Sequence, residues 1–160
     1  MHGTAWKFGD NINTDEIIPA RYLNTSDDAE LGRHCMEDAD PELVEKISRG
    51  DIIVGGSNFG CGSSREHAGR AIIAAGVSCV VAESFARIFF RNAINIGLPI
   101  VECPDAAREA ETGDVLSVDI ETGEVTNETK GKTYGFPPFA PEMKEIVEAG
   151  GLMKFVAKKV

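Results

Sequence analysis

Positive charge is scarce in this sequence of 160 residues. Its 16 lysines and arginines stand against 26 aspartates and glutamates, for a formal net charge of −10. Nucleic acids and anionic membranes are bound by basic surfaces. The charge balance therefore argues against a partner of either kind. Any anionic ligand must be held by a local group of positive side chains or backbone N–H groups.

Long apolar runs and closely paired cysteines are also missing. No stretch reaches the roughly 20 apolar residues that span a bilayer, and the opening MHGTAWKFGD lacks the pattern of a secretory signal. The four cysteines, at positions 35, 61, 79 and 103, form no C-x-x-C pair. We therefore expect reduced thiols, no zinc or iron–sulfur site within this chain, and a cytoplasmic protein.

Apolar runs and helical patterns alternate along the middle of the chain. Strands are predicted at 51–56, 77–83 and 98–103, with helices at 64–76 and 84–97 between them. This β-α-β-α-β order is typical of a parallel sheet with right-handed crossovers. The predicted fold class is α/β, a mainly parallel sheet with flanking helices plus a β-hairpin, in one domain over residues 1–160.

Weaker patterns surround this unit. Residues 24–40 are acidic and irregular, and we expect them to form a mobile loop that orders with a partner and substrate. The other predicted elements are a strand at 4–8, a turn segment at 9–16, a short helix near 28–36, a hairpin over 114–128 and a helix over 141–151 that ends at glycines.

The segment GSNFGCGSSREHAGRA, residues 56–71, places glycines and serines directly before a predicted helix. It lacks the lysine of a Walker A loop, the third glycine of a dinucleotide motif and the final glycine of a nucleophile elbow. Backbone N–H groups, Ser63, Ser64 and Arg65 at a helix N-terminus instead suit a carboxylate-sized anion. The structural alternative is a capping box between Ser63 and Glu66.

Three motifs carry a resemblance to a known family. GSSREHA (62–68), NTDEI (13–17) and SFARI (84–88) resemble segments of the aconitase superfamily in the same order, and nearly the whole chain is similar to the small-subunit family of the 3-isopropylmalate dehydratases. The resemblance implies the swivelling β/β/α domain of that superfamily. It also implies a hydro-lyase of leucine biosynthesis that isomerises 2-isopropylmalate to 3-isopropylmalate by dehydration and rehydration.

The resemblance also assigns roles to single residues. Ser63 matches the base that takes a proton from the carbon beside a substrate carboxylate, Arg65 matches the clamp on that carboxylate, and Asp15 matches a further catalytic group. Asp15 also suits ordinary turn capping, and Ser64 suits a helix cap. The substrate-binding residues implied are Ser64, Thr14, Leu23, Asn24 and Thr25.

Two arginines on the predicted helix at 84–97 are interpreted differently. Arg87 and Arg91 lie one helical turn apart and either add positive potential or pair with acidic neighbours. We favour the structural interpretation. No metal ligand is assigned within this chain.

The resemblance implies a large partner subunit that carries a [4Fe–4S] cluster. The active site then lies between the subunits, and this chain is expected to be inactive alone. Its ligand is a small dicarboxylate. Whether the isolated subunit forms a homo-oligomer is left open.

The segment RYLNT, residues 21–25, bears on the choice of substrate. In the two-subunit family, an arginine after the Tyr-Leu pair is typical of homoaconitase, whose substrates carry an extra carboxylate. This chain has Asn24 and Thr25 after that pair instead. A rotamer of Arg21 could return a cation there. Isopropylmalate ranks first, a short branched malate such as 2,3-dimethylmalate second and homoaconitate third. A non-catalytic anion-binding module is the alternative function.

Overall fold

One seven-stranded sheet runs through the protein, which the computed structural model describes over residues 1–25, 27–63 and 65–159. The strand order is β4-β3-β2-β1-β5-β6-β7. The parallel half contains β1 (His2–Lys7), β2 (Ile52–Gly55), β3 (Cys79–Ala82) and β4 (Ile100–Glu102). The antiparallel half contains β5 (Val115–Asp119), β6 (Glu124–Asn127) and β7 (Lys132–Gly135), with β5 paired to β1.

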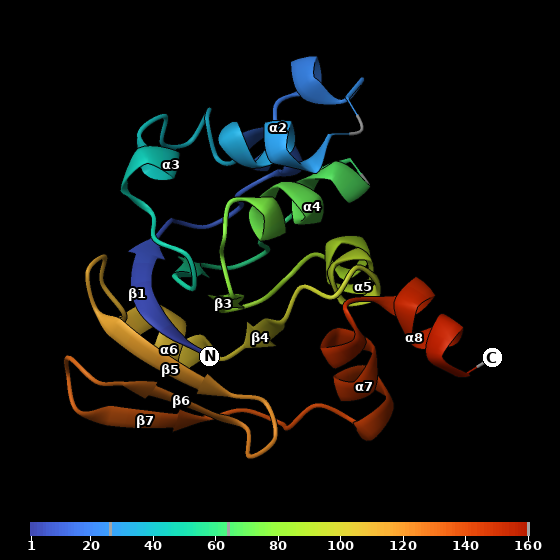
Figure 1. The fold of residues 1–160 in the computed structure, drawn as a ribbon. Helices are drawn as coiled ribbons and strands as arrows, with labels where there is room; N and C mark the ends of the chain where they lie inside the picture. The colour runs from blue at the N-terminus through green and yellow to red at the C-terminus, as the bar shows by residue number, and fades with distance from the viewer. Residues whose placement is uncertain (26, 64, 160) are drawn as a thin grey trace.

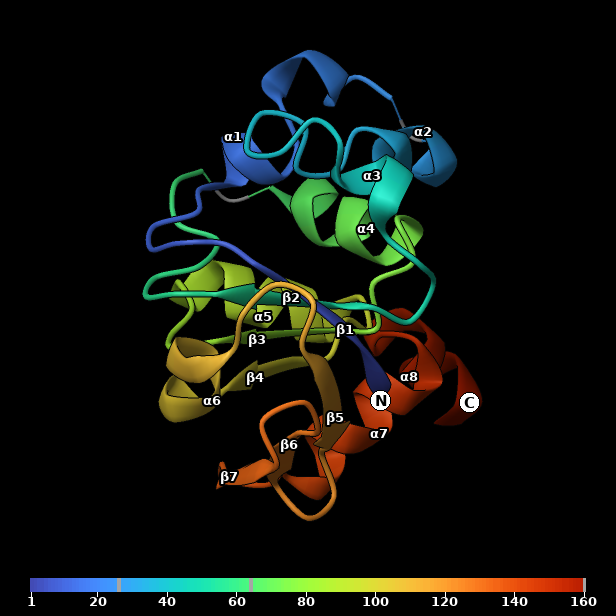
Figure 2. The same cartoon turned by 90° about the vertical axis from the view of Figure 1, so that its left-hand side faces the viewer.

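Helices lie on both faces of the parallel strands. The helices above the strands in Figure 2 are α1 (Thr14–Ile17), α2 (Asp28–Arg33), α3 (Leu43–Lys46) and α4 (Glu66–Ala74). In the same view α6 (Pro104–Glu109) lies below the strands, beside β5–β7. Figure 1 shows further helices together on the side of β4, namely α5 (Arg87–Asn95), α7 (Pro141–Ala149) and α8 (Leu152–Lys159).

Both faces of the parallel strands are buried. Ile53 and Val80 point into a core shared with α2, α4 and α5, whereas Val54 and Val81 point into a second core shared with α6 and β5. Strands covered on both faces have continuous apolar sequences rather than alternating ones. This explains why β2 and β3 were predictable as short apolar runs.

The predicted parallel order is confirmed, and the sheet extends beyond the prediction. The hairpin turn falls at Gly123, where φ is +78°, as predicted. A third antiparallel strand, β7, and four helices, α1, α3, α6 and α8, were not predicted; α1 begins inside the segment 9–16 that was predicted as a turn. Gly150 and Gly151 both have positive φ and end α7 as expected, but the chain turns there and continues as α8. Because one sheet joins both halves, we keep the prediction of one domain.

The acidic segment 24–40 packs more closely than its composition suggests. The predicted helix forms as α2, and Leu31, Cys35 and Met36 are buried in the first core. A Cβ added to Gly32 would lie 2.7 Å from the carbonyl carbon of Ala74 on α4, so the two helices approach very closely. The prediction of an irregular excursion is therefore corrected for the part that contains α2. Ordering by a partner stays a prediction.

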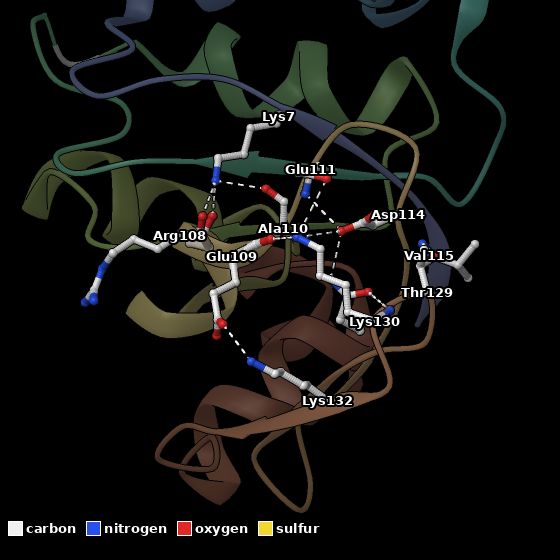
Figure 3. Close-up of polar contacts among 12 residues, drawn as sticks. Lys7, Arg108, Glu109, Ala110, Glu111, Asp114, Val115, Thr129, Lys130 and Lys132 are labelled. Atoms are coloured by element: carbon white, nitrogen blue, oxygen red, sulfur yellow. Dashed lines mark hydrogen bonds and ion pairs between the residues drawn. The ribbon is translucent and has the colours of Figure 1, made fainter.

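Two lysines fix the end of α6 under the sheet (Figure 3). Lys7 at the end of β1 donates from Nζ to the carbonyl oxygens of Arg108 and Ala110, each at 3.0 Å. Lys130, which follows β6, donates to the carbonyl of Glu109. Cations are favourable at the carbonyl end of a helix. These bonds tie α6 to both halves of the sheet.

Three of the four cysteines are buried, and the fourth lies in the glycine-rich segment. Burial raises the pKa of Cys35 and of Cys79 to about 12, and it also raises the pKa of Cys103. Cys61 is half-buried. The thiolate is the reactive form of cysteine. Because the other three thiols are buried and their pKa values are raised, Cys61 is the accessible thiol of the folded chain.

We expect one fast-reacting thiol in the native protein. Titration with a chromogenic disulfide near pH ~8 should modify Cys61 quickly and Cys35, Cys79 and Cys103 only after unfolding. The matched control, Cys61→Ser, should show no fast phase. A second fast thiol in the native wild-type protein would contradict the burial of the other three.

Candidate active site

Three segments that are distant in the sequence meet beyond the carboxyl end of β2. The glycine-rich turn, residues 56–62, runs between residues 11–14 and 84–86 and forms an isolated β-bridge with each side. Gly60 N donates to the carbonyl O of Ile12 at 2.7 Å. The three motifs that carry the family resemblance therefore converge at one place.

Gly60 allows the turn to pack directly against α5. Its φ is +85°, and a Cβ added there would lie 2.2 Å from Cγ of Phe89. The Phe89 ring packs edge to face with that of Phe59, with centroids 5.5 Å apart, and Phe59 is fully buried. The turn and the first turn of α5 are therefore fixed relative to each other.

Thr14 fixes the backbone of Ser63. The Thr14 side chain is buried, and its Oγ1 donates to the carbonyl O of Ser63 at 3.0 Å. Thr14 N donates to the carbonyl O of Cys61 at 2.9 Å. Ser63 itself is exposed, and its hydroxyl has no hydrogen-bond partner among residues 1–25, 27–63 and 65–159. The predicted base is thus held by its backbone while its side chain faces outward.

Arg65 and Asp15 form an ion pair across the site. Asp15 lies on α1, whose start is fixed by a capping box between Asn13 and Glu16. The Arg65 side chain is only 17% exposed, whereas that of Asp15 is 61% exposed. The structure therefore brings together four of the predicted residues, and Asp15 holds the guanidinium of Arg65 from the solvent side.

A pocket of about 390 Å³ opens among these residues. It extends from the glycine-rich turn to the first turn of α5, and no acidic side chain is among its described lining residues. Among those described lining residues, the only charged groups are the guanidinium groups of Arg65 and Arg87. The described lining residues are Thr14, Asn58, Gly60, Gly62, Ser63, Arg65, Ala86, Arg87, Ile88, Phe89 and Asn92.

The pairing of Arg87 and Arg91 with acidic neighbours is not observed. Neither arginine makes an ion pair within the described part of the chain. The nearby Glu83 instead pairs with Arg108 at 2.9 Å, and Glu102 accepts a backbone N–H at 3.2 Å. Arg87 lines the pocket. The sequence left open that Arg87 adds positive potential, and its place in the pocket lining agrees with that alternative rather than with the structural ion pair that we favoured.

The predicted start of α4 is wrong. The helix begins at Glu66, and its N-cap is Arg65, with φ −126° and ψ 115° and no side-chain cap. Ser63 precedes the N-cap by two residues, so it forms no capping box with Glu66. Ser64 lies outside the described residues. The N-terminal turn that contributes side chains and backbone to the pocket belongs to α5 rather than to α4.

The structure does not bring residues 23–25 to this pocket. Leu23 packs against the first core, and Asn24 is exposed. The Thr25 hydroxyl donates to a carboxylate oxygen of Glu30 at 3.1 Å. Arg21 is held by two acidic side chains, those of Glu37 and Asp38, at 3.0 and 3.1 Å. A role of Leu23, Asn24 and Thr25 in substrate binding stays a prediction.

The residues described in this structure include no group of three or more His, Cys, Asp or Glu side chains that could hold a metal ion. The first core surrounds Cys35, and the second surrounds Cys79 and Cys103. A [4Fe–4S] cluster therefore does not fit on the described residues.

None of the helices in the described part of the chain is long and apolar enough to cross a membrane.

Comparison with known proteins agrees with this geometry. The sequence profile of the aconitase C-terminal domain matches residues 3–106. The chain is 60% identical over its whole length to the 3-isopropylmalate dehydratase small subunit of Moorella thermoacetica, of which it covers 96%. It is 62% identical over 96% of its length to the same subunit of Caldicellulosiruptor bescii, of which it covers 93%.

A solved structure shows the same fold. The crystal structure of 3-isopropylmalate dehydratase from Methanocaldococcus jannaschii superposes with a TM-score of 0.94 at 44% identity, covering 99% of this chain and 93% of that one. The predicted fold class is confirmed. The chain belongs to the aconitase C-terminal domain family and, within it, to the family of the 3-isopropylmalate dehydratase small subunits.

Proposed function

We propose that this chain works as the small subunit of a two-subunit hydro-lyase of leucine biosynthesis. The enzyme isomerises 2-isopropylmalate to 3-isopropylmalate by removing water and adding it back in the reverse orientation. The observation that carries the proposal is the pocket in which an exposed serine hydroxyl lies beside guanidinium groups and no acidic side chain from the described chain. The names of its relatives support the same activity.

In this proposal Ser63 moves the proton. As the alkoxide, its Oγ takes a proton from the carbon beside a substrate carboxylate, and the electron pair of the broken C–H bond shifts toward that carboxylate. In rehydration the Ser63 hydroxyl returns a proton to carbon. A serine alkoxide is costly near neutral pH, so it needs positive groups fixed in advance. Arg65 and Arg87 supply that positive charge in the pocket.

Arg65 binds the carboxylate beside the reacting carbon. A guanidinium can donate two parallel hydrogen bonds to a carboxylate, which fixes its plane as well as its position. The negative charge that develops during proton removal lies on this carboxylate, where Arg65 stabilises it. Asp15 positions Arg65 through the ion pair and does not itself line the pocket.

The departure of hydroxide requires a Lewis acid, and the described residues of this chain hold no site for one. We propose that a large subunit carries a [4Fe–4S] cluster, which acts as the Lewis acid in that step. The active site would then lie between the two subunits, with the pocket described here as the contribution of this chain. A homo-oligomer of the isolated chain and its cytoplasmic location stay predictions.

The proposed substrate carries two carboxylates. The segment at residues 23–25 provides no cation for a third carboxylate, and Arg21 is held by acidic side chains. An unpaired, desolvated carboxylate costs several kcal/mol. We therefore keep isopropylmalate as the first choice, 2,3-dimethylmalate as the second and homoaconitate as the third.

The isolated chain is expected to show no turnover of 2-isopropylmalate. Mixing it with a cluster-loaded large subunit should give dehydration, measured by the ultraviolet absorbance of the new double bond, because only the pair holds both the base and the Lewis acid. The large subunit alone is the control. Turnover by the isolated chain would contradict the proposal that the base and the Lewis acid lie on different subunits. Dicarboxylate binding without turnover by the pair would favour an anion-binding module.

A further inference from the structure

We infer that Arg87 is a second carboxylate-binding residue of the active site. The inference rests on the proposed function, in which the substrate is a dicarboxylate. Arg65 binds the carboxylate beside the carbon that loses its proton, and Arg87 binds the other carboxylate. Arg87 thereby makes the pocket selective for a substrate with two negative groups.

The pocket presents these two guanidinium groups from different elements. Arg65 precedes α4, and Arg87 is the first residue of α5. Both line the same cavity of about 390 Å³, together with the exposed Ser63. Two cations from separate elements can engage two carboxylates of one ligand at once, with the base beside them.

The two arginines differ in their ion pairing. Arg65 is paired with Asp15, which offsets part of its charge. Arg87 makes no ion pair with the described residues: Glu83 pairs with Arg108, and Glu102, which lines a neighbouring cavity with Arg87 and Arg91, accepts the backbone N–H of Phe85. The guanidinium of Arg87 therefore faces a pocket whose described lining contains no acidic side chain. An anionic ligand would supply the missing partner.

The position of Arg87 in its helix is unfavourable for folding. It is the first residue of a nine-residue helix that has no acidic residue in its first turn and no side-chain cap at Ala86. A cation at the N-terminal end of a helix opposes the helix dipole. A residue whose position in a helix is unfavourable, with no contact that compensates for it, is expected at a functional site.

The scaffold under Arg87 is rigid. Phe89, two residues further along α5, stacks against Phe85 with centroids 6.1 Å apart and packs edge to face with Phe59. The same Phe89 ring is in close contact with Gly60 of the glycine-rich turn. The base of the Arg87 side chain is therefore held at a fixed place relative to Ser63. Such a fixed placement is what selective binding requires.

Arg87→Gln tests the inference in the assembled enzyme. Charged hydrogen bonds of this kind change binding by about 10- to 100-fold, so kcat/KM for 2-isopropylmalate should fall by that factor, mainly through KM. Arg87→Lys should recover part of the loss. The matched control is Arg91→Gln, one turn along the same exposed face and outside the described lining of the pocket. It should behave as the wild-type enzyme does.

The charge of the ligand gives a second measurement. Isopropylsuccinate, a dicarboxylate without the reacting hydroxyl, and its two monoamides serve as competitive inhibitors. Wild-type enzyme should bind the diacid more tightly than either monoamide. Arg87→Gln should bind the diacid and one monoamide equally, while it still discriminates against the other. A residue with only a structural role would weaken all three inhibitors together.

The outcomes separate the inference from the proposed function. Wild-type enzyme that fails to convert 2-isopropylmalate overturns both. Active wild-type enzyme with Arg87→Gln equal to Arg91→Gln overturns the inference alone. Size-exclusion chromatography with the large subunit should show unchanged assembly of Arg87→Gln, and lost assembly would identify Arg87 as an interface residue and overturn the inference. Loss of discrimination against one monoamide, with assembly intact, supports it.

Discussion

Replacing Ser63 with alanine should lower kcat of the assembled enzyme by about 10³-fold, the scale of a lost proton-transfer group. Among the described residues that line the pocket, Ser63 is the only one with an exposed hydroxyl, and no histidine, lysine, cysteine or carboxylate stands in for it. The Thr14 hydroxyl is buried and donates to the Ser63 carbonyl. Nothing else on the described lining can take the proton.

A matched variant separates chemistry from folding in this experiment. Ser57→Ala changes another exposed serine of the same glycine-rich turn, outside the described lining of the pocket, and should retain wild-type turnover. Both variants should assemble with the large subunit and bind a dicarboxylate inhibitor as the wild-type chain does. Deuterium exchange at the substrate carbon should be lost in Ser63→Ala only. Normal turnover by Ser63→Ala would remove Ser63 from the proposed mechanism.

The convergence of the motifs was predictable, but only through the family resemblance. Local patterns placed the 56–62 turn at the carboxyl end of an apolar strand, which is where parallel sheets carry their sites. They could not show that residues 11–14 run along one side of this turn and residues 84–86 along the other. Those contacts are hydrogen bonds between distant backbone segments. No periodicity in the sequence records them.

The helix start at Glu66 shows how a local rule can select the wrong position. The S-x-x-E pattern beginning at Ser63 suited a capping box, but the chain enters α4 through Arg65 in an extended conformation. The same rule applied to Asn13 and Glu16 identifies a real capping box. The first pattern fails because Thr14 holds the Ser63 carbonyl outside the helix, a tertiary contact that overrides the propensity of the segment.

The role of Arg87 depends on where its acidic neighbours point. From the sequence, an ion pair with acidic neighbours was the favoured interpretation, and Glu83 and Glu102 are the acidic residues nearest to Arg87 along the chain. In the structure Glu83 pairs with Arg108, and Glu102 accepts a backbone N–H. Whether a surface charge is satisfied is decided by three-dimensional placement, so the sequence alone could not distinguish a paired arginine from a free one.

Gly60→Ala is expected to lower the free energy of unfolding by about 3 kcal/mol or more, from left-handed backbone strain and overpacking together. The new Cβ would lie 2.2 Å from Cγ of Phe89 and 2.5 Å from its Cβ. Neither side can move easily, because Phe89 is packed in an aromatic cluster and Gly60 N is bonded to the carbonyl of Ile12. Urea denaturation of the isolated chain, followed by circular dichroism, measures the change.

Gly113→Ala isolates the steric part of this effect. Gly113 also has positive φ, +98°, but no atom lies within 4 Å of an added Cβ, so only the backbone strain of about 1 kcal/mol should appear. Removing the opposing ring in Gly60→Ala/Phe89→Ala should give a smaller loss than the sum of the two single changes, because the contacts with the ring are then absent and only the contact with Cβ of residue 89 remains. Equal losses for Gly60→Ala and Gly113→Ala would show that the turn and α5 are not in close contact, and the fixed spacing of Ser63, Arg65 and Arg87 would lose its support.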